Sequence, residues 1–266
     1  MTALSAFLAS HPDAVLVDVA EAKGSTPREA GAFMVVAADA LFGTIGGGQL
    51  EFLAIDHARM LLASGEPDSS LDVPLGPEIG QCCGGRTRLA FTRLDAQSQQ
   101  VLVDRQAKLE TAYPDVFLFG AGHVGRALAI ALVPLPLTVT LVETRDLAPD
   151  SLPHGVALRR VAVPEAEVAM IRSGGAAVIL THDHALDFLI ARQALARPDL
   201  AYVGMIGSAT KRATFARWLD REGGDACVLD RLVLPIGGSA LRDKRPPVIA
   251  ALVAAELLGI LLDGKP

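Results

Sequence analysis

Residues 117–128 read FLFGAGHVGRAL, an apolar run that leads through three glycines into a helical pattern. Gly120, Gly122 and Gly125 have the spacing Gly-x-Gly-x-x-Gly. With this spacing the first glycine permits a tight turn, the second lets the backbone approach a ligand, and the third lets the helix pack closely on the strand. The first turn of the helix also presents N–H groups to a phosphate. The stretch therefore predicts a strand–turn–helix unit with room for a phosphate-bearing ligand.

The chain beyond residue 115 continues this alternation of strands and helices. Further strand-like runs read LTVTLVE, AAVILTH, AYVGMIG and RLVLPIGG, and helical runs alternate with them. Continuous apolar strands between helices indicate a parallel sheet covered on both faces. We therefore expect residues 115–266 to form a Rossmann-like domain with a mainly parallel sheet. Glu143, at the end of the second strand, lies where an acidic side chain binds a ribose hydroxyl, so a nucleotide at this loop is one hypothesis. The alternative is a glycine turn retained only for packing.

Residues 1–100 predict a different, mixed α/β domain. A strand is expected over 14–20 and two short strands within 31–45, after which apolar residues recur at helical spacing until Gly65 and Pro67. The run TRLAFTRLD predicts one more strand. Residues 101–114 are polar and helix-prone, and we expect them to link the two domains.

The composition excludes several classes of protein. The net charge is −6, so no basic surplus exists to neutralise nucleic-acid phosphates. The longest uncharged stretch, residues 127–142, contains Pro134 and Pro136. It is also shorter than the about 20 residues that a membrane helix needs, and we interpret it as a helix, a turn and a strand. Three cysteines cannot build a disulfide framework, and no signal-peptide pattern precedes the first strand. We expect a cytoplasmic protein with no membrane segment and no nucleic-acid partner.

Two loops of the first domain are candidate anion sites. Gly46, Gly47 and Gly48 stand directly before the predicted helix, where N–H groups favour an anion. The alternative is a flexible joint between strand and helix. Ser25 and Arg28 lie in the turn GSTPR, whose hydroxyl and guanidinium suit a phosphate or a carboxylate. The alternative is a surface loop with an exposed Arg28.

A histidine-containing segment follows the strand-like run AAVIL. His182, Asp183 and His184 are placed at the edge where doubly wound sheets bind ligands, so ligand contact and metal binding are both open. Asp183 has a further alternative, which is to cap the following helix. Glu256 is the only charged residue between positions 248 and 262, and we expect it to face solvent.

The pair Cys82 and Cys83 lies in GQCCGG, and Cys227 is the only other cysteine. A disulfide between adjacent cysteines needs a strained ring, and zinc sites usually have cysteines two or more residues apart together with further ligands. Two interpretations stay open. One is an exposed thiolate that faces a soft metal, and the other is a pair of small buried residues in a tight turn.

Six stretches of the chain, taken in order, have the pattern of a single family. They read GSTPREAGAFMVV, GTIGGGQLE, GQCCGGRTRL, FGAGHVGRAL, YVGMIGSATKR and LPIGGSALRDKRPPVIAALVAAEL. Because they span nearly the whole chain, the composite is far more specific than any one motif. The chain resembles the XdhC/CoxI family of accessory proteins for molybdenum hydroxylases, and within it the xanthine dehydrogenase accessory branch.

This resemblance implies a protein that binds the pterin-based molybdenum cofactor, molybdopterin, and is not itself an enzyme. Such proteins support the exchange of an oxo for a sulfido ligand by a cysteine desulfurase. They then deliver the product to an apo-hydroxylase such as xanthine dehydrogenase. The resemblance also implies a homo-oligomer, and it leaves open whether the cofactor is plain or nucleotide-extended.

The resemblance also implies site residues. The matching positions are Gln81, Cys82, Cys83, Gly84 and Gly85 for the family's cysteine motif, and Gly120, Gly122, His123 and Gly125 for its dinucleotide-like loop. It implies that Cys82 or Cys83 contacts molybdenum. Related members often have a cysteine near Gln49, where this chain has none, and residues 143–145 read Glu-Thr-Arg where relatives have Asp-x-Arg.

Two other classes of function compete with this one. The first is an NAD(P)-dependent oxidoreductase with Glu143 on the ribose, although no proton-relay pair can be identified from the sequence. The second is an interaction protein with a vestigial nucleotide fold.

Overall fold

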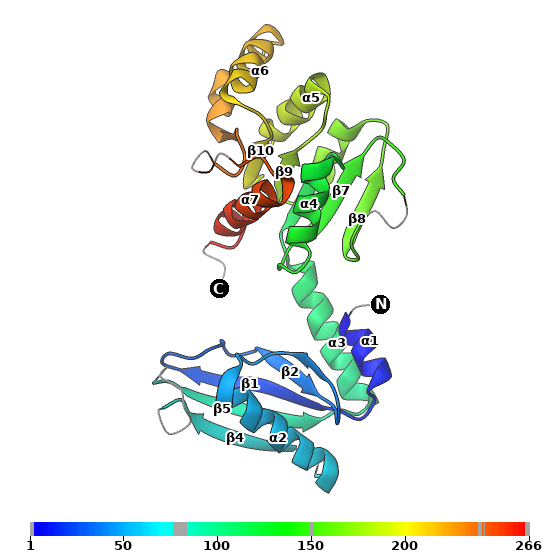
Figure 1. Ribbon diagram of the computed structural model, residues 1–266, viewed down its shortest axis with the longest axis vertical. Helices are drawn as coiled ribbons and strands as arrows, with labels where there is room; N and C mark the ends of the chain where they lie inside the picture. Colours follow the sequence, from blue (N-terminus) through cyan, green and yellow to red (C-terminus); the bar gives the residue numbers. More distant parts are fainter. Residues whose placement is uncertain are drawn as a thin grey trace. The chain divides into compact units, whose positions relative to one another are not determined.

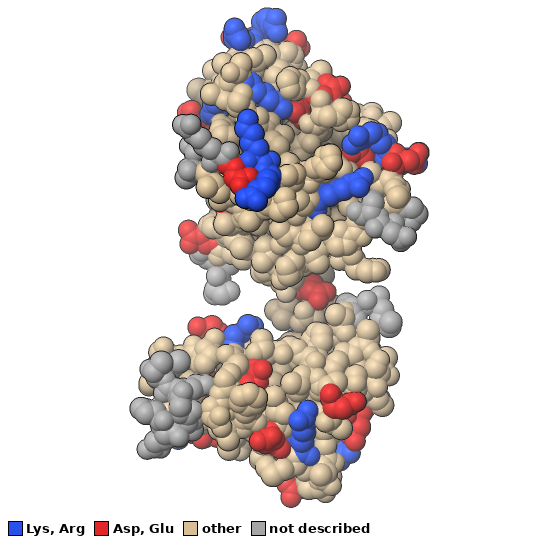
Figure 2. All heavy atoms as spheres, in the orientation of Figure 1, with Lys and Arg blue, Asp and Glu red and all other residues tan. Residues whose placement is uncertain are grey.

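The computed structural model describes residues 3–66, 68–76, 84–148, 152–238, 241 and 243–263. The chain divides into two compact units, residues 1–108 and 109–266, which are described one at a time (Figure 1). Among the described residues, no helix combines the length and apolar character that crossing a membrane requires. Lys and Arg side chains lie among Asp and Glu side chains on the face drawn in Figure 2.

The first unit is an antiparallel sheet with helices on both faces. Its elements are α1 (Ala3–Ser10), β1 (Val15–Lys23), β2 (Phe33–Val36), β3 (Leu41–Gly43), α2 (Gly48–Ser64), β4 (Asp68–Pro74), β5 (Arg86–Arg93) and α3 (Ala96–Thr111). The strand order is β3-β2-β1-β5-β4, with every neighbouring pair antiparallel. The expected strands and the helix that ends at Gly65 are confirmed. The stretch expected to be a linker falls largely within α3, which runs across the boundary between the units.

Alternation along the strands explains the two layers of this unit. Val15, Val17 and Val19 of β1 are buried in one cluster with α2. The opposite face of the sheet packs with Leu4 of α1 and Leu102 of α3 in a second cluster. Side chains in a strand point alternately to the two faces, so each face acquires its own apolar surface.

The second unit has the architecture that the glycine motif predicts. Its strands are β6 (Asp115–Phe119), β7 (Thr138–Glu143), β8 (Val156–Arg160), β9 (Ala176–Ile179), β10 (Tyr202–Met205) and β11 (Leu232–Val233). Its helices are α4 (His123–Leu132), η3 (Pro164–Met170), α5 (His184–Leu195), α6 (Ala209–Arg221), η4 (Ala226–Arg231) and α7 (Pro246–Leu261). The order is β11-β10-β9-β6-β7-β8 and all pairs are parallel. This is the doubly wound order of nucleotide-binding folds, so the predicted fold class is confirmed.

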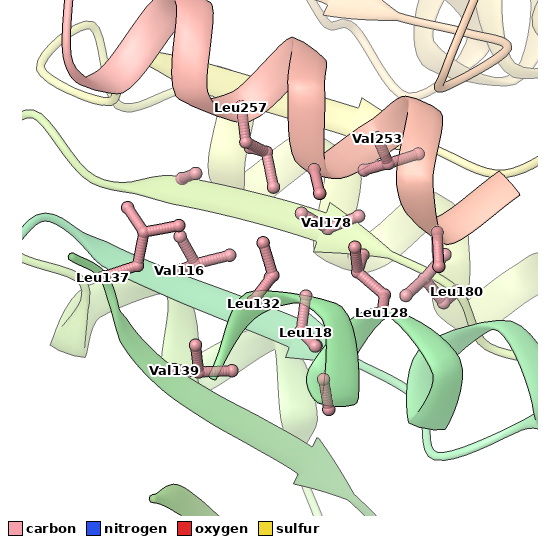
Figure 3. Packing of buried hydrophobic residues seen from close by; sticks show 14 of the residues in the cluster. Val116, Leu118, Leu128, Leu132, Leu137, Val139, Val178, Leu180, Val253 and Leu257 are labelled. Carbon is pink, nitrogen blue, oxygen red and sulfur yellow. The ribbon is translucent and has the colours of Figure 1, made fainter. Parts of the chain in front are cut away.

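Helices cover both faces of the parallel sheet. Helices α4 and α7 pack on one face, where Leu128 and Val253 meet Val116 and Val178 (Figure 3). On the other face Phe119 and neighbouring strand residues pack with α5, α6 and η3. Strand β6 is buried throughout, which is why it reads as a continuous apolar run.

Candidate functional site

The glycine loop of the second unit connects β6 to α4. Gly120 has φ 116°, and a Cβ there would lie 2.7 Å from the carbonyl oxygen of Leu180. A Cβ on Gly125 would overlap the carbonyl oxygen of Gly120. Both positions therefore need glycine for packing alone. Gly122 differs, because a Cβ there would meet no atom of the described residues within 4 Å, so their packing does not explain this glycine.

A cavity of about 470 Å³ opens beside this loop. It is lined by the loop, by the end of β7, and by Thr181 and His182 after β9. The chain continues from β6 to β7 on one side of the sheet and from β9 to β10 on the other. The cavity thus lies at the point where the strand order reverses, the place at which doubly wound folds bind ligands. His123, Arg126 and Arg145 also line it, so the walls suit an anionic ligand. Of the sequence-predicted residues, Gly120, Gly122, His123, Glu143 and His182 all line this one cavity.

Glu143 is almost fully buried, with 5% of its surface exposed. Its carboxylate accepts hydrogen bonds from the N–H of Ala121 at 2.9 Å and of Thr144 at 2.8 Å. The Arg145 guanidinium donates to both oxygens, through Nε at 3.2 Å and Nη2 at 2.8 Å. Burial opposes the charge, but the hydrogen bonds from Arg145 and from the loop N–H groups outweigh it and lower the pKa from 4.5 to about 2. Glu143 therefore ties the glycine loop to the end of β7, and its predicted contact with a ribose stays a prediction.

A second cavity, of about 580 Å³, adjoins the first and shares Thr181 and His182 with it. His184, Ser208 and Lys244 lie on its walls. At the same cavity the Lys211 ammonium donates to the fully buried carboxylate of Asp187 and, at 3.0 Å, to the carbonyl of Ile206. This buried ion pair was not anticipated from the sequence, because it joins residues of two different helices.

One residue of the segment 182–184 also has a structural role. Asp183 accepts hydrogen bonds from the N–H groups of Ala185 at 2.8 Å and Leu186 at 3.4 Å, so its interpretation as a helix cap is confirmed. The two histidines line the cavities. No cluster of three or more His, Cys, Asp or Glu side chains suited to a metal ion occurs within the described part of the chain.

Three loops of the first unit come together at one end of its sheet. A Cβ on Gly85 would overlap the carbonyl oxygen of Ser25. A Cβ on Gly46 would overlap the ring of Pro27 and lie 3.3 Å from Cγ of Arg28. The loops that carry Ser25 and Arg28, Gly46–Gly48, and Gly84–Gly85 are therefore in direct contact. Three candidate segments that are far apart in sequence form one cluster, which we call the loop cluster.

The helix start within the loop cluster is already partly occupied by the chain itself. Glu51 accepts hydrogen bonds from the N–H of Ile45 at 3.2 Å, the N–H of Gly47 at 3.0 Å and the hydroxyl of Thr44 at 2.6 Å. Sequence reasoning missed Glu51, although an acid in the first turn of a helix is a recognisable capping signal. An anion bound at Gly46–Gly48 would have to share this helix start with the Glu51 carboxylate.

Arg28 supplies positive charge to the loop cluster. Its side chain is exposed, and within the described part of the chain it has no acidic partner. A Cβ on Gly47 or on Gly84 would meet no atom of the described residues within 4 Å. As far as the described residues show, the loop cluster thus combines a guanidinium without an acidic partner and two stretches of backbone that no side chain covers.

The predicted thiol pair belongs in sequence to the same region. Strands β4 and β5 form a hairpin, and Gly84 N–H donates to the Leu75 carbonyl at 2.8 Å. Gln81, Cys82 and Cys83 lie between these two residues in sequence and outside the described residues. Cys227 is exposed on the second unit, and a hydrogen bond with Asp225 raises the pKa of its thiol, so it is not an activated thiolate.

The surroundings of Glu256 overturn one expectation. The residue is half-buried rather than directed to solvent, and its carboxylate accepts a hydrogen bond from the N–H of Gly237 at 2.6 Å. The glycine turn after β11 returns over α7 and covers this position.

Comparison with known proteins gives matches over both units. Residues 7–73 match the model of the XdhC and CoxI family, and residues 116–257 match the XdhC Rossmann domain. The uncharacterized protein YqeB of Escherichia coli strain K12 is 28% identical over 255 residues, which are 92% of this chain and 43% of that protein. The chain thus spans about two-fifths of the length of that curated relative.

A solved structure has the same fold over almost its whole length. It is described as a xanthine dehydrogenase from Bacillus halodurans, and it superposes with a TM-score of 0.81 at 17% identity over 98% of this chain and 95% of that one. The Rossmann match alone covers more than half of the chain. Taken with the match in the first unit, it shows that the chain belongs to the XdhC and CoxI family.

Proposed function

We propose that this protein is an accessory factor that holds the molybdenum cofactor as cargo while a molybdenum hydroxylase of the xanthine dehydrogenase type matures. Family membership supports the proposal, and the observation that carries it is the loop cluster. Three segments singled out by sequence are in contact there, and one of them continues directly into Cys82 and Cys83. A binding site for a large cargo needs several loops at one place, and the sheet brings these three loops together at one of its ends.

The chemistry of the loop cluster fits the two ends of this cargo. Molybdopterin carries a phosphate. The exposed guanidinium of Arg28, which has no acidic partner among the described residues, lies beside exposed Ser25 and suits a phosphate group. The molybdenum end is soft and is bound through dithiolene sulfur, so a thiolate is a suitable neighbour for it. We propose that Cys82 or Cys83 contacts this end, and that the open backbone at Gly47 and Gly84 admits the pterin.

The proposal includes partners. A cysteine desulfurase would supply sulfur for the exchange of the oxo ligand, and an apo-hydroxylase would receive the cargo. The protein would act as a homo-oligomer and would itself carry out no turnover. The cavity at the glycine loop of the second unit would hold a nucleotide, because its walls combine an uncapped helix start with Arg126 and Arg145.

The thiol part of the proposal is tested by cargo occupancy. Wild-type protein and a Cys82→Ala, Cys83→Ala double variant are purified from cells supplied with molybdate. Molybdenum is measured by elemental analysis, and released pterin by fluorescence after oxidation. We expect the double variant to lose most of both signals. Single variants then identify the thiol that makes the contact.

A matched control is available within the chain. Cys227→Ala removes an exposed thiol from the second unit and should leave occupancy unchanged. Arg28→Ala should lower pterin content without removing a thiol. Equal pterin and molybdenum in the wild-type protein and the double variant would exclude the thiols from binding.

One observation favours a second candidate, an NAD(P)-dependent oxidoreductase. Lys211, which is paired with buried Asp187, lines the cavity that adjoins the cavity at the glycine loop. Such a pair could relay a proton, and the sequence alone identifies no proton-relay pair. Under this alternative, purified protein would oxidise or reduce a nicotinamide nucleotide in the presence of small carbonyl or alcohol substrates. Lack of turnover by protein that binds cargo would leave the accessory role as the better account.

A further inference from the structure

The acceptor sites of Glu143 are already filled. One oxygen, Oε1, accepts from the N–H groups of Thr144 at 2.8 Å and Arg145 at 3.2 Å and from Arg145 Nε at 3.2 Å. The other, Oε2, accepts from Ala121 N–H at 2.9 Å and Arg145 Nη2 at 2.8 Å. A carboxylate has about four lone-pair sites in total. No acceptor remains for the two hydroxyl groups of a ribose diol.

Exchange of these donors for a diol is unfavourable. Three of them are backbone N–H groups of the loop and of the strand end, and they cannot leave without unfolding the turn. A fourth is the Thr144 hydroxyl, 3.3 Å from Oε1. The other two belong to Arg145, whose charge-assisted bonds are about twice as strong as those of a neutral hydroxyl. A diol would also leave the guanidinium without its acid. The carboxylate of Glu143 therefore accepts hydrogen bonds from the protein's own backbone and from Arg145, and not from a ribose.

Arg145 is the group that faces the ligand instead. Its side chain is 54% exposed although two of its nitrogens bind Glu143, and it lines the cavity. Its Nη1 has no hydrogen-bond partner within the described part of the chain. Arg126 lines the same cavity, and among the described residues its one hydrogen bond runs from Nε to the Ala121 carbonyl at 2.9 Å. The nearby Asp146 is paired with Arg160, so its charge is compensated. Two guanidinium groups thus face one cavity.

From this arrangement we infer that the cavity selects a nucleotide that carries a phosphate on the ribose next to β7, and that Arg145 is the residue that makes the selection. The inference rests on the nucleotide site included in the proposed function. A phosphate monoester can bind the free edge of Arg145 while the bonds to Glu143 stay in place, because guanidinium has five N–H donors in a planar fork. The charge of Glu143 is offset by its three backbone donors.

The experiment compares two small probes that differ in this phosphate alone. Adenosine 2′,5′-bisphosphate and adenosine 5′-monophosphate are titrated into the full-length protein by calorimetry. We expect the bisphosphate to bind roughly tenfold more tightly or better, the size of one hydrogen bond to a charged group. NADP⁺ against NAD⁺ should show the same direction.

Variants distinguish a specific contact of Arg145 with the phosphate from a general effect of positive charge. Arg145→Ala should abolish the preference, and should favour the monophosphate because Oε2 of Glu143 then keeps only the Ala121 N–H and has an acceptor site free. Arg145→Lys keeps the charge and compensates buried Glu143, so it should fold and retain only part of the preference. Arg217→Ala on α6 removes an exposed arginine outside this cavity and should change nothing. Melting curves identify any variant that fails to fold.

The outcomes are distinct. Equal or tighter binding of the monophosphate to wild-type protein would overturn the inference while leaving a nucleotide site in place. An unchanged preference in folded Arg145→Ala or Arg145→Lys would also overturn it. Absence of binding by either probe would overturn the inference together with the nucleotide part of the proposed function, whereas the cargo site in the first unit would be judged by its own occupancy assay.

Discussion

Neutralising Glu143 gives the sharpest test of how the second unit is held together. Glu143→Gln removes the negative charge that receives the Ala121, Thr144 and Arg145 donors. The fall of the pKa from 4.5 to about 2 corresponds to about 3 kcal/mol of folding free energy at neutral pH. Because Glu143 is only 5% exposed, solvent screening takes little from this figure. We expect the variant to be less stable by about 3 kcal/mol at pH 7.

The pH dependence gives a second signature. The pKa of Glu143 is lower in the folded protein than in the unfolded chain, so its stabilisation is fully present above about pH 5 and is lost as the pH falls towards about 2. The difference in stability between wild type and variant should therefore be constant from pH 7 to pH 5. It should fall to roughly half or less by pH 3.

The assay can report on the second unit by itself. Trp218 is the only tryptophan of the chain and packs against Phe188 and Phe215 on α5 and α6. Its fluorescence during urea unfolding follows this unit, and Asp220→Asn, an exposed carboxylate on α6, is the control. The reasoning is wrong if Glu143→Gln unfolds at the wild-type urea concentration at pH 7. It is also wrong if the difference stays constant down to pH 3.

Three further predictions use the same unfolding assay or a binding assay. Gly125→Ala should destabilise the second unit by about 1–3 kcal/mol through overlap with backbone, whereas Gly122→Ala should keep stability within about 1 kcal/mol and weaken nucleotide binding; equal effects on both assays would contradict the assigned roles. Gly85→Ala should separate the loops of the first unit and lower both its melting temperature and its pterin content. A variant with wild-type pterin content would refute the role of the loop cluster as the cargo site. Lys211→Met should cost about 3–5 kcal/mol because it leaves a buried carboxylate without its cation. Adding Asp187→Leu should recover only part of that loss, because it also removes the acceptor of the Thr181 N–H and hydroxyl; a double variant no better than the single one would contradict the pairing.

Much of the second unit is predictable from the sequence because its strands are buried on both faces. Strands β6, β7, β9 and β10 read as continuous apolar runs, and the glycine spacing marks the turn after β6. Strand β8 was not predicted, since it lies at the sheet edge and most of its residues are exposed. For the same reason β4, an edge strand with a single buried residue, was also missed.

The site could be predicted by residue type but not by interaction. The pattern placed Glu143 at the end of β7, yet the identity of its partner depends on how Arg145 folds back, two residues later. The expectation for Glu256 was wrong because a lone charge in an apolar helix reads as solvent-facing until the turn at Gly237 is known to cover it. Contacts between elements far apart in sequence are tertiary and leave no local signature.

The loop cluster illustrates the same limit. The turn at Ser25, the glycines at 46–48 and the glycines at 84–85 each looked explicable as a local joint. Only their packing, in which Gly85 leaves no room for a Cβ beside Ser25, turns three weak signals into one site. The glycines are visible in the sequence, whereas the contacts that require glycine at positions 46 and 85 are visible only in the structure.

The most direct test of the cargo proposal is native mass spectrometry of the protein purified without oxygen from cells supplied with molybdate. The account predicts a bound species whose mass and isotope pattern are those of a pterin with molybdenum, and its loss in the Cys82→Ala, Cys83→Ala variant. Protein that is free of pterin and molybdenum, from cells in which the cofactor is shown to be made, would contradict the account.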